Sequence, residues 1–190
     1  MNIDLQNRIF TISSDKDFEK LTFEIFNFQM KNNEIYRTYS NKILNKKQPN
    51  TILEIPFLPI EFFKEKKVFT NDRKVDKVFF SSGTSESKSK HIVADLNIYE
   101  RSFLTGFSNF YGNPKDYCFL ALLPNYLKQE NSSLIYMVNR FIEASSYKES
   151  GFILDDMDSL AKTLQSLEER SIKTILFGVT YSLIDFAKLH

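Results

Sequence analysis

Hydrophobic residues recur at helical spacing through the first fifty residues of the chain. Ser13 and Ser14 are residue types that begin helices, and Asp15 and Asp17 suit the positive end of a helix dipole. Apolar residues then follow three or four positions apart, at Phe18, Leu21, Ile25 and Phe28 and, after a polar break, at Ile35, Tyr39 and Ile43. This pattern predicts helices, which the polar loop at 46–50 ends.

From Lys74 onward, short apolar runs alternate with amphipathic stretches. The apolar runs predict strands at 75–80, 91–94, 117–123, 152–154 and 173–179. The stretches between and after them predict helices at 96–110 behind the cap Asp95, from Ser132, at 156–170 and from Thr180. This alternation predicts an α/β fold with a mostly parallel sheet flanked by helices. We expect residues 1–73 to form a helical appendage packed on an α/β core of residues 74–190.

The last predicted helix keeps its apolar periodicity up to His190, and no Gly, Asn or Pro terminator follows Thr180. We therefore expect the chain to be part of a longer protein.

Composition narrows the possible functions. The 190 residues include 25 Lys plus Arg and 24 Asp plus Glu, a net charge of +1 that argues against a dedicated nucleic-acid binder. No apolar run approaches the roughly 20 residues of a membrane span, and the first ten residues do not form a signal peptide. We expect a cytoplasmic protein without a membrane span.

The few cysteines and histidines exclude several kinds of site. A single cysteine, Cys118, cannot form an intrachain disulfide or a Cys-rich zinc site, and two histidines make a His-based metal site improbable. Cys118 lies in an apolar run without a basic neighbour that could lower its pKa, which predicts a buried structural thiol.

The clearest chemical motif is the polar loop from Ser81 to His91, which directly follows a predicted strand. Its hydroxyl side chains, glycine and two lysines could surround phosphate oxygens, although a solvated hairpin turn explains the same composition. It is not a Walker A loop, because Ser87 stands where the second glycine should precede Lys88.

This loop resembles the phosphate-binding signature of adenylate-forming enzymes, Ser-Ser-Gly-Thr-Thr-Gly followed by a lysine. The chain is most similar to acyl-protein synthetases, which are related to phenylacetate–CoA ligases. Further similar stretches follow in the same order along the chain: Ile55–Ile60 before Phe62–Lys64, Ser89–His91, Leu120–Leu127 with Asn131–Leu134, and Leu176–Tyr181.

The resemblance implies a two-step reaction. A carboxylic acid, expected to be a fatty acid, attacks the α-phosphate of ATP with Mg²⁺, and the acyl group then passes to a thiol. By analogy, the triphosphate-binding residues would be Ser81, Ser82, Gly83, Thr84, Ser85 and Lys88. Lys90 and His91 would be the catalytic candidates, although an isolated histidine is more often simply packed or solvated.

The acyl-phosphate would lie near Ser132, Ser133 and Gly178. Ser132 and Ser133 begin a predicted helix, so ordinary N-capping is the alternative. Gly178 ends a predicted strand, where α/β sheets bind ligands, and a plain strand-to-helix turn is its alternative.

The sequence departs from the family pattern at two points. Ser85-Glu86-Ser87 replaces the second glycine of the loop, and Glu86 brings a negative charge towards the phosphates. The acidic, ribose-binding and C-terminal lysine motifs cannot be placed before His190, so the resemblance predicts the N-terminal part of an adenylate-forming fold, inactive alone.

The residues of the chain are also compatible with two other functions. One is an acyltransferase that uses no ATP, and the other is a non-catalytic binding module. The expected partners of the adenylating enzyme are a small carboxylic acid and an acyl acceptor, which could be a protein, a carrier protein or coenzyme A.

Overall fold

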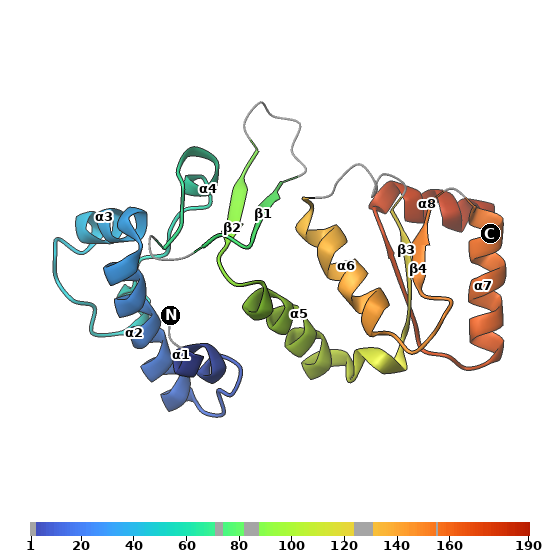
Figure 1. Ribbon diagram of the computed structural model, residues 1–190, viewed down its shortest axis with the longest axis horizontal. Helices are drawn as coiled ribbons and strands as arrows, with labels where there is room; N and C mark the ends of the chain where they lie inside the picture. The colour runs from blue at the N-terminus through green and yellow to red at the C-terminus, as the bar shows by residue number, and fades with distance from the viewer. Residues whose placement is uncertain (1–2, 71–73, 82–87, 124–130, 155) are drawn as a thin grey trace. The chain divides into compact units, whose positions relative to one another are not determined.

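The computed structural model describes residues 3–70, 74–81, 88–123, 131–154 and 156–190 (Figure 1). The chain divides into two compact units, Met1–Tyr99 and Glu100–His190. The division between these units falls between Tyr99 and Glu100. The two strands after Lys74 belong to the same unit as the N-terminal helices. The second of these strands contacts the helix at 62–65, and the side-chain amide of Gln6 donates a hydrogen bond to the Asp95 carboxylate (3.2 Å).

The first unit contains the predicted N-terminal helices. Its helical elements are α1 (Ile3–Arg8), α2 (Asp15–Asn32), α3 (Glu34–Ile43), the 3-10 turn η1 (Ile52–Glu54) and the short α4 (Phe62–Glu65). Ser14 caps α2 by accepting a hydrogen bond from the Asp17 amide, as expected. Asn33 ends α2 and caps α3, because its side chain accepts a hydrogen bond from the Tyr36 amide. The polar break between the two apolar patterns is therefore a tight helix junction.

A β-hairpin completes the first unit. Strands β1 (Lys77–Phe80) and β2 (Lys90–Val93) pair antiparallel, with Phe79 opposite His91 and Phe80 opposite Lys90. The expectation that these strands join a mostly parallel sheet is wrong. Only residues 81–89 separate the two strands, and a parallel pair needs a crossover of a dozen or more residues. They form a sheet of their own.

The second unit contains the predicted parallel sheet. Strands β3 (Cys118–Leu122), β4 (Gly151–Ile153) and β5 (Thr174–Gly178) lie in the order β4-β3-β5, and both pairings are parallel. Helices α6 (Ser133–Ala144), α7 (Met157–Glu169) and α8 (Thr180–Leu189) follow the three strands in turn. Helix α5 (Leu96–Tyr111) and the 3-10 turn η2 (Pro114–Asp116) precede β3.

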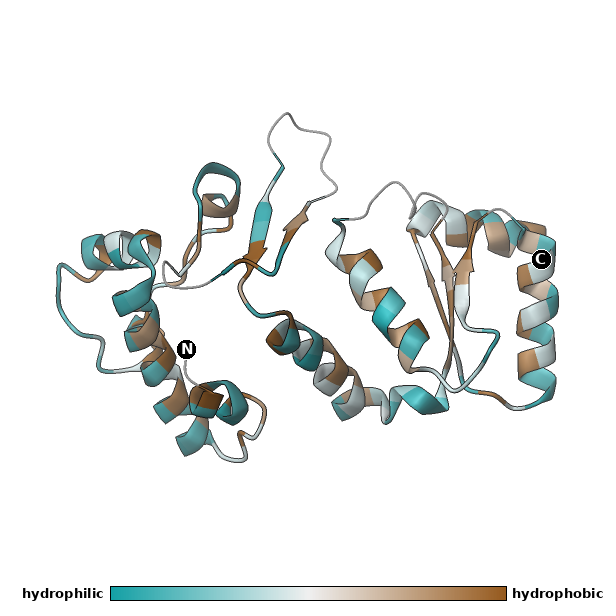
Figure 2. Cartoon of the chain, viewed as in Figure 1, coloured by the Kyte–Doolittle hydropathy of each residue, from teal (hydrophilic) through white to brown (hydrophobic). Residues whose placement is uncertain are grey.

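Helices cover both faces of this sheet (Figure 1). On one face, the Phe119 ring contacts Phe107 of α5 and Phe141 of α6, with ring centroids 5.5 and 5.3 Å away. On the other face, buried residues of β3 and α7 form one cluster, and side chains of α8 pack against it. Successive residues of β3 point to opposite faces, so one strand supplies both cores. Hydrophobic residues are concentrated in these strands (Figure 2).

Within the described ranges, the structure contains no helix that is both long and apolar enough to cross a membrane.

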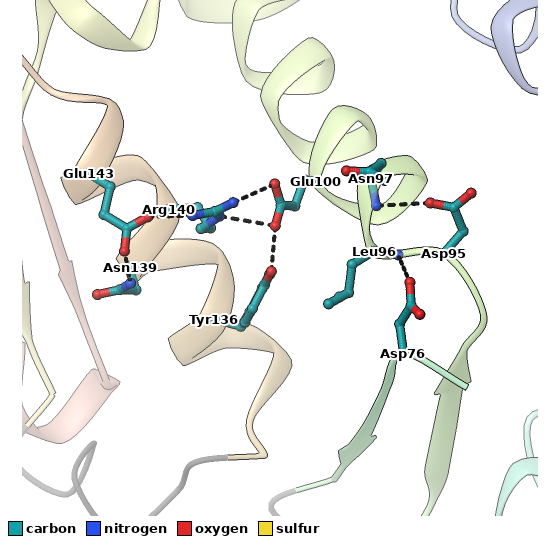
Figure 3. A network of polar contacts seen from close by, with 9 residues as sticks. All are labelled: Asp76, Asp95, Leu96, Asn97, Glu100, Tyr136, Asn139, Arg140 and Glu143. Atoms are coloured by element: carbon teal, nitrogen blue, oxygen red, sulfur yellow. Dashed lines mark hydrogen bonds and ion pairs between the residues drawn. The ribbon is translucent and has the colours of Figure 1, made fainter. Parts of the chain in front are cut away.

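A charged cluster joins α5 to α6 in the second unit (Figure 3). The Arg140 guanidinium donates to both carboxylate oxygens of Glu100, from Nε at 3.0 Å and from Nη2 at 2.8 Å. The Tyr136 hydroxyl donates to the same carboxylate. Arg140 also pairs with Glu143 at 2.6 Å. The hydrogen bonds from Arg140 hold the pKa of Glu100 below its ordinary value, and burial together with Glu100 raises the pKa of Tyr136 to about 12.

We expect this cluster to make the stability of the protein fall at alkaline pH. The pKa of Tyr136 is about 12 in the folded chain and near 10 for an ordinary tyrosine, so its contribution is present below pH 10 and lost as the pH rises towards 12. Tyr136→Phe should therefore flatten the dependence of the unfolding free energy on pH between about 10 and 12, measured by urea denaturation.

Tyr181→Phe is the matched control, because the Tyr181 side chain is 59% exposed. The control should keep the slope of the wild-type chain. An unchanged slope in Tyr136→Phe would contradict the assignment of the alkaline loss to this cluster.

Candidate functional site

The predicted phosphate loop lies at the turn of the hairpin. Its neck is closed by two hydrogen bonds, from the Ser81 amide to the Ser89 carbonyl (3.1 Å) and from the Ser89 amide to Ser81 Oγ (3.1 Å). Ser81 therefore holds the two ends of the loop together, and its Oγ accepts one of the two hydrogen bonds. Four of the predicted site residues, Ser82, Gly83, Thr84 and Ser85, lie outside the described residues.

Lys88 and Lys90 are both exposed; they lie on the arm of the hairpin that follows the loop and leads into β2. Neither forms an ion pair with a carboxylate in the described parts of the chain. Lys90 lies opposite Phe80 in the strand register, and the next residue, His91, projects to the other face of the hairpin. The hairpin thus presents two cations near the neck of the loop, where Ser81 and Ser89 are hydrogen-bonded.

His91 packs against aromatic rings. Its imidazole centroid lies 6.3 Å from the Phe79 ring and 6.1 Å from the Tyr99 ring. Burial lowers the pKa of His91 below its ordinary value, so the imidazole is mostly neutral at pH 7. His91 thus contacts two rings although the residue is exposed, which fits the packed or solvated alternative, and a catalytic role for His91 stays a prediction.

The other predicted residues gather at the carboxyl edge of the parallel sheet. Ser132 caps α6, because its hydroxyl accepts a hydrogen bond from the Ile135 amide at 3.4 Å. The capping alternative for Ser132 is thus confirmed, and Ser133 is the first residue of the helix. Gly178 ends β5 directly beside Leu122, the last residue of β3. This is the edge at which open α/β sheets bind ligands.

Packing explains why residue 178 is a glycine. A Cβ atom added there would lie 2.6 Å from Cδ2 and 2.7 Å from Cγ of Leu183. Leu183 belongs to α8 and packs against the buried cluster that contains Leu122. Leu183 of α8 therefore leaves no room for a side chain at residue 178. This fits the alternative that Gly178 serves an ordinary turn from a strand to a helix.

We expect Gly178→Ala to lower the unfolding free energy by about 1 to 3 kcal/mol, the usual cost of overpacking a core. Urea denaturation of both proteins measures the difference. Gly151→Ala in β4 is the control, because an added Cβ there meets no atom within 4 Å. Equal losses in the two variants would contradict the packing explanation.

Cys118 is a structural residue, as predicted. Its side chain is fully buried in β3, and the Ser150 hydroxyl donates a hydrogen bond to its Sγ (3.6 Å). Burial raises the pKa of the thiol, which keeps it protonated and unreactive at neutral pH. The acyl acceptor in the expected reaction must accordingly come from elsewhere.

We expect Cys118 to react with a thiol reagent such as Ellman's reagent at least about tenfold more slowly in the native chain than in denaturant. The denatured chain should release one equivalent, because the sequence contains one cysteine. A Lys162→Cys variant, which places a thiol on an exposed position of α7, should react at once in the native state. Rapid native labelling of Cys118 would contradict its burial.

The predicted residues fall into two groups that belong to different compact units. Lys88, Lys90 and His91 share the hairpin of the first unit, whereas Ser132, Ser133 and Gly178 share the sheet edge of the second. Sequence reasoning missed the Glu100 cluster, although Tyr136, Arg140 and Glu143 recur three or four residues apart on one helix face. No spacing in the sequence indicates that Glu100, forty residues before Arg140, is their partner.

No group of three or more His, Cys, Asp or Glu side chains that could hold a metal ion lies among the described residues. Comparison of the chain with protein-family models, curated proteins and solved structures found no match.

Proposed function

We propose that the protein takes part in ATP-dependent activation of a carboxylic acid, a fatty acid in the first instance, followed by transfer of the acyl group to a thiol. The observation that carries this proposal is the hairpin with a closed neck, which presents Lys88 and Lys90 beside a loop rich in hydroxyl groups. The motif resemblance supplies the reaction class. The second unit, taken by itself, has an anion-favouring position at the start of α6.

The first chemical step joins two anions. A carboxylate oxygen forms a bond to the α-phosphorus of ATP, the bond from that phosphorus to the oxygen bridging to the β-phosphate breaks, and pyrophosphate leaves. Both reactants are negatively charged, so cations beside the phosphates lower the barrier to their approach. Lys88 and Lys90 fit this need, because both ammonium groups are exposed and neither is neutralised by a described carboxylate.

The start of α6 suits the acyl-phosphate. Ser132 satisfies one backbone amide of the first helical turn, and the dipole of this twelve-residue helix favours negative charge at the same end. In this proposal Ser132 keeps the helix end in place while Ser133 contacts the ligand. Magnesium would accompany the nucleotide in this reaction, and we assign it no ligand from the described residues.

The acyl acceptor in this proposal is a thiol on another molecule. Cys118, the one thiol of the chain, is fully buried and held protonated by its surroundings. Coenzyme A, a carrier protein or a cysteine of a partner protein would each supply the sulfur. The thiolate attacks the carbonyl carbon of the acyl-adenylate, and AMP leaves with the electrons of the broken C–O bond.

The test is ATP binding in the presence of magnesium, measured by titration calorimetry. We expect Lys88→Ala and Lys90→Ala each to weaken binding about tenfold or more, the usual effect of losing one hydrogen bond to a charged group. Lys77→Ala is the matched control, because Lys77 lies on the same hairpin at the end far from the loop. The control should bind ATP like the unchanged chain.

Equal weakening in all three variants would show only a general loss of positive charge and would contradict the assigned roles. Absence of ATP binding in the unchanged chain, together with acyl transfer from a thioester without nucleotide, would replace the proposal by ATP-independent acyl transfer.

A further inference from the structure

Three large apolar side chains project into solvent from one short segment of the first unit. The exposed fractions are 95% for Leu53, 79% for Phe57 and 71% for Ile60. They lie within eight consecutive residues: Leu53 is in η1, and Phe57 and Ile60 are in the segment between η1 and α4. We call these three residues the apolar protrusion. Single exposed apolar side chains scattered over a surface are common, but three within eight residues of one segment need an explanation.

The protrusion is held in place from both sides. Ile55 and Pro56, between its members, are buried, and the Tyr36 hydroxyl of α3 donates a hydrogen bond to the Pro56 carbonyl (2.9 Å). At its far end, the Phe62 ring lies 5.5 Å from that of Tyr39, also on α3. Pro56 further restricts the backbone. The segment is thus tied to α3, while the protrusion residues point away from the folded unit.

Lysines surround the protrusion in the sequence. The stretch 42–67 holds six lysines and three glutamates, a formal charge of +3 in a chain whose total is +1. All six are exposed: Lys42, Lys46, Lys47, Lys64, Lys66 and Lys67. None forms an ion pair with a carboxylate in the part of the chain that the structure describes. The stretch of sequence that carries the three exposed apolar side chains therefore also carries a positive excess.

We propose that the apolar protrusion is an anchor for an anionic lipid surface. Its apolar side chains would enter the boundary between headgroups and acyl chains, and the neighbouring lysines would lie against the lipid phosphates. The combination favours a lipid surface because projecting apolar groups enter a fluid interface without a matching pocket, and because unpaired lysines complement its negative charge. This inference does not depend on the proposed enzymatic function.

Partitioning of the full chain onto vesicles tests the proposal. We expect binding to phosphatidylcholine vesicles that contain about one third phosphatidylserine, and much weaker binding to phosphatidylcholine alone. Leu53→Ser combined with Phe57→Ser should reduce the partition coefficient at least about tenfold, since each substitution removes a large apolar side chain from the interface. Lys66→Gln combined with Lys67→Gln should reduce it about fivefold or more.

Two control variants test whether any exposed apolar side chain, or any exposed lysine, has the same effect on vesicle binding. Phe110→Ser removes an 85% exposed side chain at the end of α5, and Lys162→Gln removes an exposed lysine of α7. Both should bind vesicles within about twofold of the unchanged chain. Thermal unfolding followed by circular dichroism shows whether each variant is folded at the assay temperature.

Several results would overturn the proposal. They are the absence of vesicle binding, equal binding to neutral and anionic vesicles, and equal losses in Phe110→Ser and the double serine variant. Sedimentation would reveal a fourth: if the unchanged chain self-associates and the double serine variant does not, the protrusion contacts a second copy instead. None of these outcomes bears on ATP binding, so the two proposals can fail separately.

Discussion

The second unit depends on the complete burial of one strand. All five residues of β3 are inaccessible to solvent, and β3 is the strand that pairs with both β4 and β5. An apolar strand buried on both faces must have its backbone groups paired on both edges, because an unpaired amide in such an environment costs as much as a lost hydrogen bond. Helices can then cover the two faces only if each turns an apolar side inward.

The identity of other residues follows from this arrangement. Ser150 satisfies several polar groups around β3. Its hydroxyl accepts a hydrogen bond from the Phe119 amide and lies within hydrogen-bonding distance of Ser145 Oγ (2.8 Å) and Cys118 Sγ. Gly178 provides the room that Leu183 needs where α8 turns back over the sheet. Both features are explained by packing, so neither is by itself a sign of catalysis. At the carboxyl edge, α6 begins behind the uncharged cap Ser132, and its dipole and amides favour an anion.

Ion pairs join elements within each of the two units. In the second unit, Glu100 and Arg140 neutralise each other between two helices, and Arg170 pairs with Glu149 at 2.6 Å. In the first unit, Arg8 of α1 pairs with Glu24 of α2 at 2.7 Å. The lysines of the hairpin arm and of the stretch 42–67 have no carboxylate partner among the described residues. Ion pairs thus fix helices in both units, and the lysines of the hairpin arm and of the stretch 42–67 stay available for phosphate groups, in a nucleotide or a lipid surface.

The sequence by itself determined the local elements. The periodicity around Phe18 and Leu21, the cap at Ser14, the apolar run 117–123 and the cap at Ser132 each correspond to an observed helix or strand, because local spacing and capping act within a few residues. Alternation in the second half also predicted the parallel sheet. Only the tertiary structure decided which strands pair. The hairpin forms its own antiparallel sheet and belongs to the first unit, and Glu100 meets Arg140 across forty residues. These outcomes depend on contacts between distant residues, and a one-dimensional pattern of apolar and polar positions carries no information on which distant side chains meet.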